Sequence, residues 1–144
     1  MLYGISPLLS PELLSILCRM GHGDQIVLAD AHFPGESGGP PVVRADGLLI
    51  PDLPGGSLPP FVTDTYTDES VLMMAPVEGD SADPSVEENY WQRIEAAWPE
   101  TPPLKKLDRF AFYDAAKSAF AIVMTGDTAK YGNLILTKGV TPIA

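Results

Sequence analysis

The stretch "GHGDQIVLAD", residues 21–30, places a histidine and a carboxylate at the two ends of an apolar run. His22 lies between two glycines, so no neighbouring side chain shields it. Its imidazole can give and take protons at neutral pH, because the unperturbed pKa of histidine is about 6.5. Asp30 follows the run directly, and a carboxylate there can accept hydrogen bonds from two hydroxyl groups. These residues alone leave two interpretations open: an acid/base with a polyol-binding carboxylate, or a spectator histidine and a turn aspartate.

Capping signals and apolar periodicity predict the elements that position these residues. A serine, a proline and an acid at 10–12 begin a helix over 11–20, which Gly21 ends. Cys18 falls on the apolar stripe of that helix and is expected to pack in the core. The run "QIVLA" is typical of a strand buried on both faces. The other predicted elements are strands around 42–44, 70–78, 120–124 and 133–136, a helix that begins at a capping box of Ser85 and Glu88, and a helix over 109–119.

The alternation of apolar strands with helices predicts an α/β fold. Strands that are apolar throughout are typical of a largely parallel sheet covered by helices on both faces. The chain has 144 residues and no internal repeat, so we expect a single domain over 1–144. Ligands bind such sheets at the carboxyl ends of the strands, which is where Asp30 stands.

Composition excludes several classes of partner. The formal net charge of −10 speaks against nucleic acid and against anionic membranes, and it favours a neutral small molecule or simply solubility. One cysteine excludes an internal disulfide framework, and no apolar run reaches the roughly 18 residues of a membrane span. The first residues lack the basic region of a signal peptide. We therefore expect a soluble, cytoplasmic protein.

Other stretches that match catalytic or metal-binding motifs are excluded by the residues around them. "GESGGP", residues 35–40, fits the G-x-S-x-G pattern of serine hydrolases, but prolines follow where that motif needs a helix, so Ser37 is interpreted as a loop serine. The two histidines and the single cysteine show no zinc-site spacing, although a weak site of His22 and His32 with aspartates can be drawn. Nucleotide-binding glycine motifs are absent from the sequence. These observations predict neither a metal nor a cofactor.

Several stretches together resemble the fucose branch of the ribose pyranase/fucose mutarotase family. They keep the family's order and spacing over most of the chain. The fucose branch is favoured by "AHFP", by Arg109, where the ribose branch tends to have a histidine, and by "YGN", where it has an alanine at Gly132. The stretches are "RMGHGDQIVLADAHFP" (19–34), "RADGLLIP" (44–51), "DTY" (64–66), "RFAFYDAAKSAFAIVMTGD" (109–127) and "YGNLILTKGV" (131–140).

The resemblance assigns roles residue by residue. It implies that His22 is the catalytic acid/base and that Asp30 holds sugar hydroxyls. The rest of the implied sugar pocket is Arg109, Tyr113, Tyr131 and Asn133, with Asp64 as a weaker member. From the residues alone, these side chains have ordinary alternatives as core, turn or surface ion-pair residues.

The resemblance also implies an activity and an assembly. The activity is interconversion of the α and β anomers of L-fucose, without a cofactor or a metal. Alternatives are a ribose pyranase that converts pyran and furan forms, and a sugar-binding protein without turnover. The implied assembly is a ring-shaped homo-oligomer, often a decamer, with sites at subunit interfaces.

Two features bear on that assembly. A strand of five residues is about 16 Å long at 3.3 Å per residue, so His22 and Asp30 are expected to lie too far apart to share one sugar within one chain unless the loop folds back. A site between two subunits resolves this. Residues 52–60, "DLPGGSLPP", replace a helical segment of the family with three prolines and two glycines, which predicts different local packing.

Overall fold

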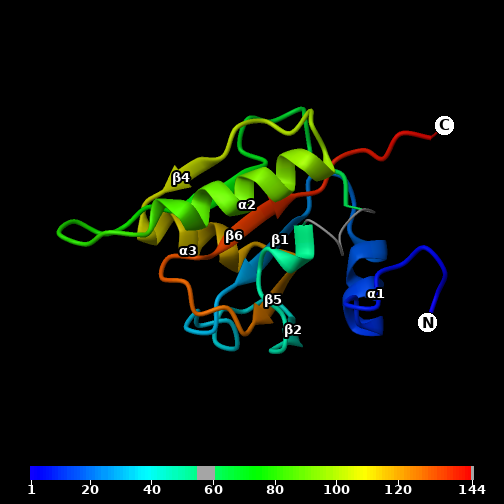
Figure 1. Cartoon of the computed structure of the whole chain (residues 1–144), viewed down its shortest axis with the longest axis horizontal. Helices are drawn as coiled ribbons and strands as arrows, with labels where there is room; N and C mark the ends of the chain where they lie inside the picture. The colour runs from blue at the N-terminus through cyan, green and yellow to red at the C-terminus, as the bar shows by residue number, and fades with distance from the viewer. Residues whose placement is uncertain (55–60, 144) are drawn as a thin grey trace.

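The computed structural model describes residues 1–54 and 61–143 (Figure 1). It contains one six-stranded sheet with the strand order β2-β5-β1-β6-β3-β4. The elements in chain order are α1 (Pro11–Arg19), β1 (Gln25–Ala29), β2 (Val42–Ala45), β3 (Val71–Met74), α2 (Pro84–Ala97), β4 (Lys105–Leu107), α3 (Arg109–Lys117), β5 (Ala121–Thr125) and β6 (Leu134–Thr137).

The sheet is largely parallel, as predicted. The pairs β1/β5, β2/β5 and β3/β4 are parallel, whereas β6 runs antiparallel to both of its neighbours, β1 and β3. β6 is therefore the one described strand that runs against the rest. β6 therefore begins on the side of the sheet where the other strands end, and it ends on the side where they begin.

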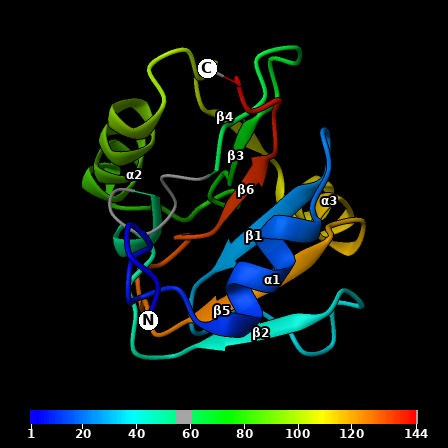
Figure 2. The same cartoon turned by 90° about the vertical axis from the view of Figure 1, so that its right-hand side faces the viewer.

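Helices cover both faces of the sheet, as predicted (Figure 2). On one face, α1 contributes Leu13 and Ile16 and α2 contributes Tyr90 and Ile94 to the larger core cluster. On the other face, α3 packs Phe112 against a second cluster. The strands between them are buried without alternation, as β1 and β5 show. Each fully buried aliphatic side chain contributes about 1.5–3 kcal/mol to stability. The well-buried sheet therefore holds the loops at both ends of its strands in place.

Helix α1 begins where predicted, but it is one residue shorter than expected, with Met20 and not Gly21 after its last turn, and its buried face also differs. The Oγ of Ser10 accepts a hydrogen bond from the backbone N–H of Leu13 at 3.2 Å, and the helix ends at Arg19. Its buried side chains are Leu13, Ile16 and Leu17, whereas Cys18 is exposed. The expectation that Cys18 packs in the core is wrong, because at 100° per residue it stands about 140° around the axis from Leu13.

The start of α2 also differs from the prediction. Its N-cap is Asp83, whose carboxylate accepts a hydrogen bond from the backbone N–H of Ser85 at 2.9 Å. Pro84 is the first helical residue, which suits proline because that position needs no N–H donor. Ser85 therefore lies inside the first turn and is not the cap of a capping box. The buried residues of α2 are Tyr90 and Ile94.

Two strand predictions need correction. The strand expected over 70–78 is shorter, Val71–Met74. The strand Lys105–Leu107 was not predicted, because two of its three residues are lysines. It is the edge strand beside β3, where charged side chains face solvent and hinder pairing with another chain.

The remaining expectations concern two loops. Ser37 lies in an exposed turn and donates its hydroxyl to the backbone oxygen of Pro34 at 3.3 Å, as expected of a loop serine. Residues 52–54 form a helical turn, with Leu53 fully buried, and the rest of the proline- and glycine-rich stretch up to 60 lies outside the described residues.

In the described part of the chain, no helix has the length and apolar character to cross a membrane.

Candidate active site

A pocket of about 230 Å³ opens where β1, β3 and β4 end and β6 begins. Its volume lies below the roughly 300–1,000 Å³ of sites for drug-sized ligands, so it suits a smaller molecule. Five of the sequence-predicted site residues meet here, from three separate segments of the chain. The lining residues are Asp30, His32, Phe33, Met74, Val77, Arg109, Tyr113, Tyr131 and Asn133.

Asp30 is the buried carboxylate of the pocket, with only 4% of the residue exposed. Burial raises the pKa of its carboxyl group, and hydrogen bonds from the backbone N–H of His32 and from the Asn133 side chain partly offset that effect. The His32 N–H donates to Oδ1 of Asp30 at 2.9 Å, and the Asp30 N–H donates to Oδ1 of Asn133 at 2.8 Å. These bonds fix the orientation of both side chains, so each presents its remaining polar atoms in a set direction.

The loop before β6 is anchored by a second buried carboxylate, Asp127. It accepts backbone N–H bonds from Ile50 at 3.1 Å and Ala129 at 2.9 Å. The hydroxyl of Tyr90 in α2 lies 3.5 Å from Asp127 and donates to the backbone oxygen of Gly132 at 3.3 Å. Burial, together with the charge of Asp127, raises the pKa of Tyr90, so this hydroxyl stays protonated as a donor. The loop therefore holds the residues on either side of Gly132 at the pocket.

Tyr131 takes a conformation that L residues rarely adopt, with φ of 58°. Its hydroxyl donates a hydrogen bond to Oδ2 of Asp80 at 2.7 Å, and Nζ of Lys130 lies 2.5 Å from Oδ1 of the same carboxylate. The bonds from Lys130 and Tyr131 lower the pKa of Asp80 to about 2. Tyr131 is thus tied to the loop that joins β3 to α2.

The first two turns of α3, with Phe33, supply the cationic and aromatic wall of the pocket. Asp108 caps this helix by accepting the N–H of Ala111 at 2.9 Å. The guanidinium carbon of Arg109 lies 5.7 Å from the ring centroid of Tyr113, whose ring in turn lies 5.7 Å from that of Phe33. The wall can contact the apolar face of a ring-shaped ligand, while the exposed Arg109 can donate to its oxygens.

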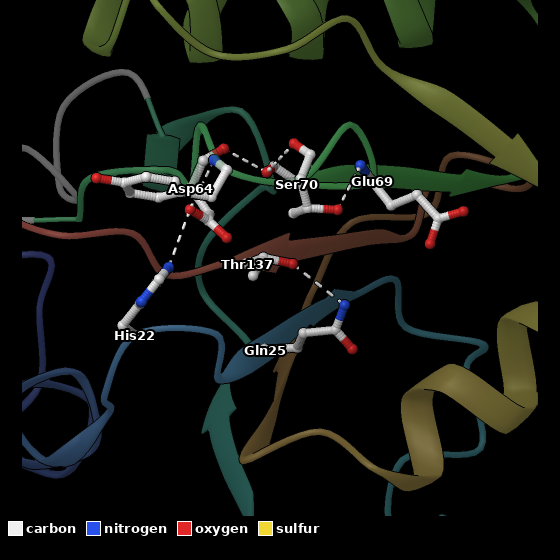
Figure 3. Close-up of polar contacts among 8 residues, drawn as sticks. His22, Gln25, Asp64, Glu69, Ser70 and Thr137 are labelled. Atoms are coloured by element: carbon white, nitrogen blue, oxygen red, sulfur yellow. Dashed lines mark hydrogen bonds and ion pairs between the residues drawn. The ribbon is translucent and has the colours of Figure 1, made fainter.

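The other two predicted residues, His22 and Asp64, lie together at the opposite ends of the strands from the pocket (Figure 3). Nε2 of His22 is 3.1 Å from Oδ1 of Asp64, whose buried carboxylate also accepts the backbone N–H of Tyr66 at 3.0 Å. The pair stands where β1 begins and β6 ends, and the Asp64 N–H donates to the backbone oxygen of Thr137. Neither residue of the pair lines the pocket. β1 lies between His22 and Asp30 in the chain and has the five residues from which a separation of roughly 16 Å is expected.

Sequence reasoning did not assign several residues at the pocket. His32 was considered only as a metal ligand, although "AHFP" directly after Asp30 points to the same loop. Asp80 lies about 50 positions before its partners and carried no local signal. Among the described residues, no group of three or more histidine, cysteine, aspartate or glutamate side chains could hold a metal ion.

The fold and the pocket define a class. A largely parallel α/β sheet ends in a small pocket with a fixed carboxylate, an amide, an arginine and aromatic rings. That set suits a small polyhydroxylated ligand, whose hydroxyls need fixed acceptors and donors and whose carbon face packs on aromatic rings.

Comparison with known proteins identifies the family. Residues 3–141 match the model of the RbsD / FucU transport protein family. The L-fucose mutarotase of Histophilus somni (strain 2336) is 56% identical over 143 residues, covering 99% of both chains. The chain belongs to the RbsD / FucU family.

Solved structures agree with this assignment. The fucose mutarotase of Streptococcus pneumoniae, in complex with L-fucose, superposes with a TM-score of 0.90 at 42% identity, covering 98% of this chain and 100% of that one. FucU from Bifidobacterium longum gives 0.91 at 41% identity, covering 96% and 99%. RbsD of Bacillus subtilis, complexed with D-ribose, shares the fold with a TM-score of 0.73 at 24% identity, covering 99% and 100%.

Proposed function

We propose that this chain catalyses the interconversion of the α and β anomers of L-fucopyranose, which makes it a carbohydrate isomerase of the racemase and epimerase class. The observation that carries the proposal is the pocket that joins Asp30, Arg109, Tyr113, Tyr131 and Asn133 from separate segments. The similarity to an L-fucose mutarotase over the whole length of the chain supports the choice of sugar.

The reaction needs only proton transfers. The anomeric hydroxyl loses a proton while the ring oxygen gains one, the C1–O5 bond opens to the aldehyde, and closure on the other face reverses these transfers. No electrons are exchanged with a cofactor, so we propose a cofactor-independent enzyme. General acid/base catalysis typically supplies about 10²–10⁴-fold, which suits a reaction that already proceeds slowly in water.

We assign the roles as follows. Asp30 and Asn133 hold the sugar hydroxyls, because their oxygens are fixed at the pocket wall. Arg109 donates to sugar oxygens and Tyr113 packs against the ring. Tyr131, or a water beside it, meets the anomeric hydroxyl. His22 gives a proton to the ring oxygen and takes it back on closure.

The last role requires a second copy of the chain, because His22 lies at the far edge of its own sheet. The histidine side chain is 47% exposed, while its partner Asp64 is only 6% exposed, so a buried carboxylate holds an accessible imidazole. This arrangement suits an acid/base that is presented to a neighbouring subunit. We therefore propose a homo-oligomer whose sites combine the pocket of one subunit with the partner subunit's His22. The resemblance described from the sequence supports a decameric ring, and the composition supports a cytoplasmic protein.

The experiment is the rate of α–β exchange of L-fucose, measured by NMR saturation transfer between the anomeric protons, with D-ribose as a parallel substrate. We expect protein-dependent exchange on fucose that is lost in His22→Ala. The exposed pair of Asp68 and Lys105, 2.6 Å apart, supplies a control variant, Asp68→Asn, which should exchange fucose at the wild-type rate. Binding of fucose without exchange would favour a sugar-binding protein, and acceleration on ribose alone would favour a pyranase.

A further inference from the structure

We infer that Asp80 is a positioning residue that orients the Tyr131 hydroxyl so that its oxygen faces the pocket as a hydrogen-bond acceptor for the anomeric hydroxyl of the sugar. The inference rests on the proposed function, since it concerns the group that receives this hydroxyl. Asp80 belongs to the loop between β3 and α2 and does not line the pocket, so it acts through Tyr131.

The hydrogen bonds that the Tyr131 hydroxyl already makes determine what it can offer a ligand. A phenol has one hydrogen to donate, and here that hydrogen goes to Oδ2 of Asp80 at 2.7 Å. The backbone N–H of Val77 approaches the same oxygen at 3.4 Å. The hydroxyl therefore has no free hydrogen for a ligand, and what it can offer the pocket is an acceptor lone pair. The anomeric hydroxyl, which must lose its proton, is the sugar group that such an acceptor fits.

The charge of Asp80 makes this orientation persistent. Lys130 lies 2.5 Å from one carboxylate oxygen while Tyr131 binds the other, so two consecutive residues of one loop share a single carboxylate. With its pKa lowered to about 2, Asp80 is ionised at neutral pH and can only accept. A hydrogen bond to an ionised acceptor is stronger than one between neutral groups.

The surroundings explain why Tyr131 needs such a partner. Its backbone lies in the left-handed region, which persists only where neighbouring contacts enforce it. Tyr131 lines the active-site pocket and also a second cavity of about 100 Å³ between β3 and the start of α2. The ring thus has space on a second side, and the Asp80 bond selects the position beside the pocket.

The activity test compares Asp80→Ala and Asp80→Asn with the control Asp68→Asn, which breaks a similar exposed ion pair with Lys105. We expect Asp80→Ala to lower kcat for fucose exchange on the order of tenfold with little change in KM, because orientation is lost at the reacting group. Asp80→Asn should lose less, since its amide oxygen can still accept from Tyr131. Adding Asp80→Ala to Tyr131→Phe should cause no further loss. A rise in KM with unchanged kcat, or an additive loss in the double variant, would overturn the inference.

A second measurement does not depend on turnover. In sugar-free protein labelled with ¹³C in the tyrosine rings, the Tyr131 signal is identified by its absence in Tyr131→Phe. We expect this signal to shift in Asp80→Ala and to stay unchanged in Asp68→Asn. A Tyr131 signal that is identical in Asp80→Ala and wild type would overturn the inference. If the wild-type protein fails to exchange fucose, the proposed function fails, but the Tyr131 signal still decides the role of Asp80.

Discussion

Replacement of Gly132 by alanine tests how the site is built, because this glycine separates the two pocket residues Tyr131 and Asn133. A Cβ atom at Gly132 would lie 2.8 Å from the backbone oxygen of Ala129, 2.8 Å from Oη of Tyr90 and 3.0 Å from Cβ of Ala129. The first of these neighbours is backbone, and the second belongs to a buried tyrosine that is hydrogen bonded to Asp127. Neither can move without disturbing the loop that carries the site.

The expected cost follows from these contacts. Inserting a methyl group into a packed site typically costs about 1–3 kcal/mol, and for a chain of this size each kcal/mol lowers the melting temperature by about 2–4 °C. We therefore expect Gly132→Ala to melt roughly 4–8 °C below wild type for a cost near 2 kcal/mol, and to lose fucose exchange because Tyr131 and Asn133 shift. Differential scanning calorimetry at a fixed protein concentration and saturation-transfer NMR measure the two effects.

A second variant identifies the cause. In Tyr90→Phe the hydroxyl that meets the new methyl group is absent, at the loss of the long contacts that its one hydrogen shares between Asp127 and the backbone oxygen of Gly132. Gly132→Ala in that background should lose less stability than in wild type, although the contact with Ala129 remains. A Gly132→Ala protein with wild-type melting temperature and exchange rate would refute the reasoning.

Two further predictions follow from the carboxylates. Burial raises the folded-state pKa of Asp30 above its unfolded value, so the native protein carries the cost of a buried charge once the pH exceeds that raised pKa. Asp30→Asn should therefore be more stable than wild type at pH 7, and this advantage in urea-unfolding free energy should shrink as the pH falls to about 4; an advantage that grows in acid contradicts the assignment. Asp64→Asn keeps the shape of the His22 partner but removes its charge, so we expect roughly a tenfold fall in kcat, a fraction of the 10²–10⁴ that acid/base catalysis supplies. An unchanged kcat in saturation transfer would show that Asp64 does not assist His22.

Much of the fold follows from local patterns in the chain. The continuous apolar runs at 25–29 and 120–124 predict buried strands, because no alternation means that both faces are covered. Where the local signal is ambiguous, the prediction is wrong. Asp83, and not Ser85, is the N-cap of α2, and Cys18 lies on the exposed side of α1 and not in the core. The sequence of β4 does not predict a strand, because two of its residues are lysines. This edge strand forms by backbone pairing with β3 and not by burial of its own apolar side chains.

The geometry of the site depends on contacts that no local pattern encodes. The reversed direction of β6 brings Asn133 to Asp30 at one edge of the sheet and carries Thr137 toward Asp64 at the other. Sequence spacing gives the length of β1, and hence the separation of His22 from Asp30, but not the partner of either. The Asp80 bond to Tyr131 joins two loops, so neither stretch predicts it alone.

The most direct test of a site shared between subunits is mixing of two variants. His22→Ala keeps its own pocket and Asp30→Asn keeps its own histidine, so each should fail to exchange fucose alone. When the two chains are coexpressed with different tags and purified as mixed oligomers, random assembly should restore about a quarter of the sites, and with them about a quarter of the wild-type exchange rate. No recovery in verified mixed oligomers, or full activity of a monomer, would contradict the account and place the whole site within one chain.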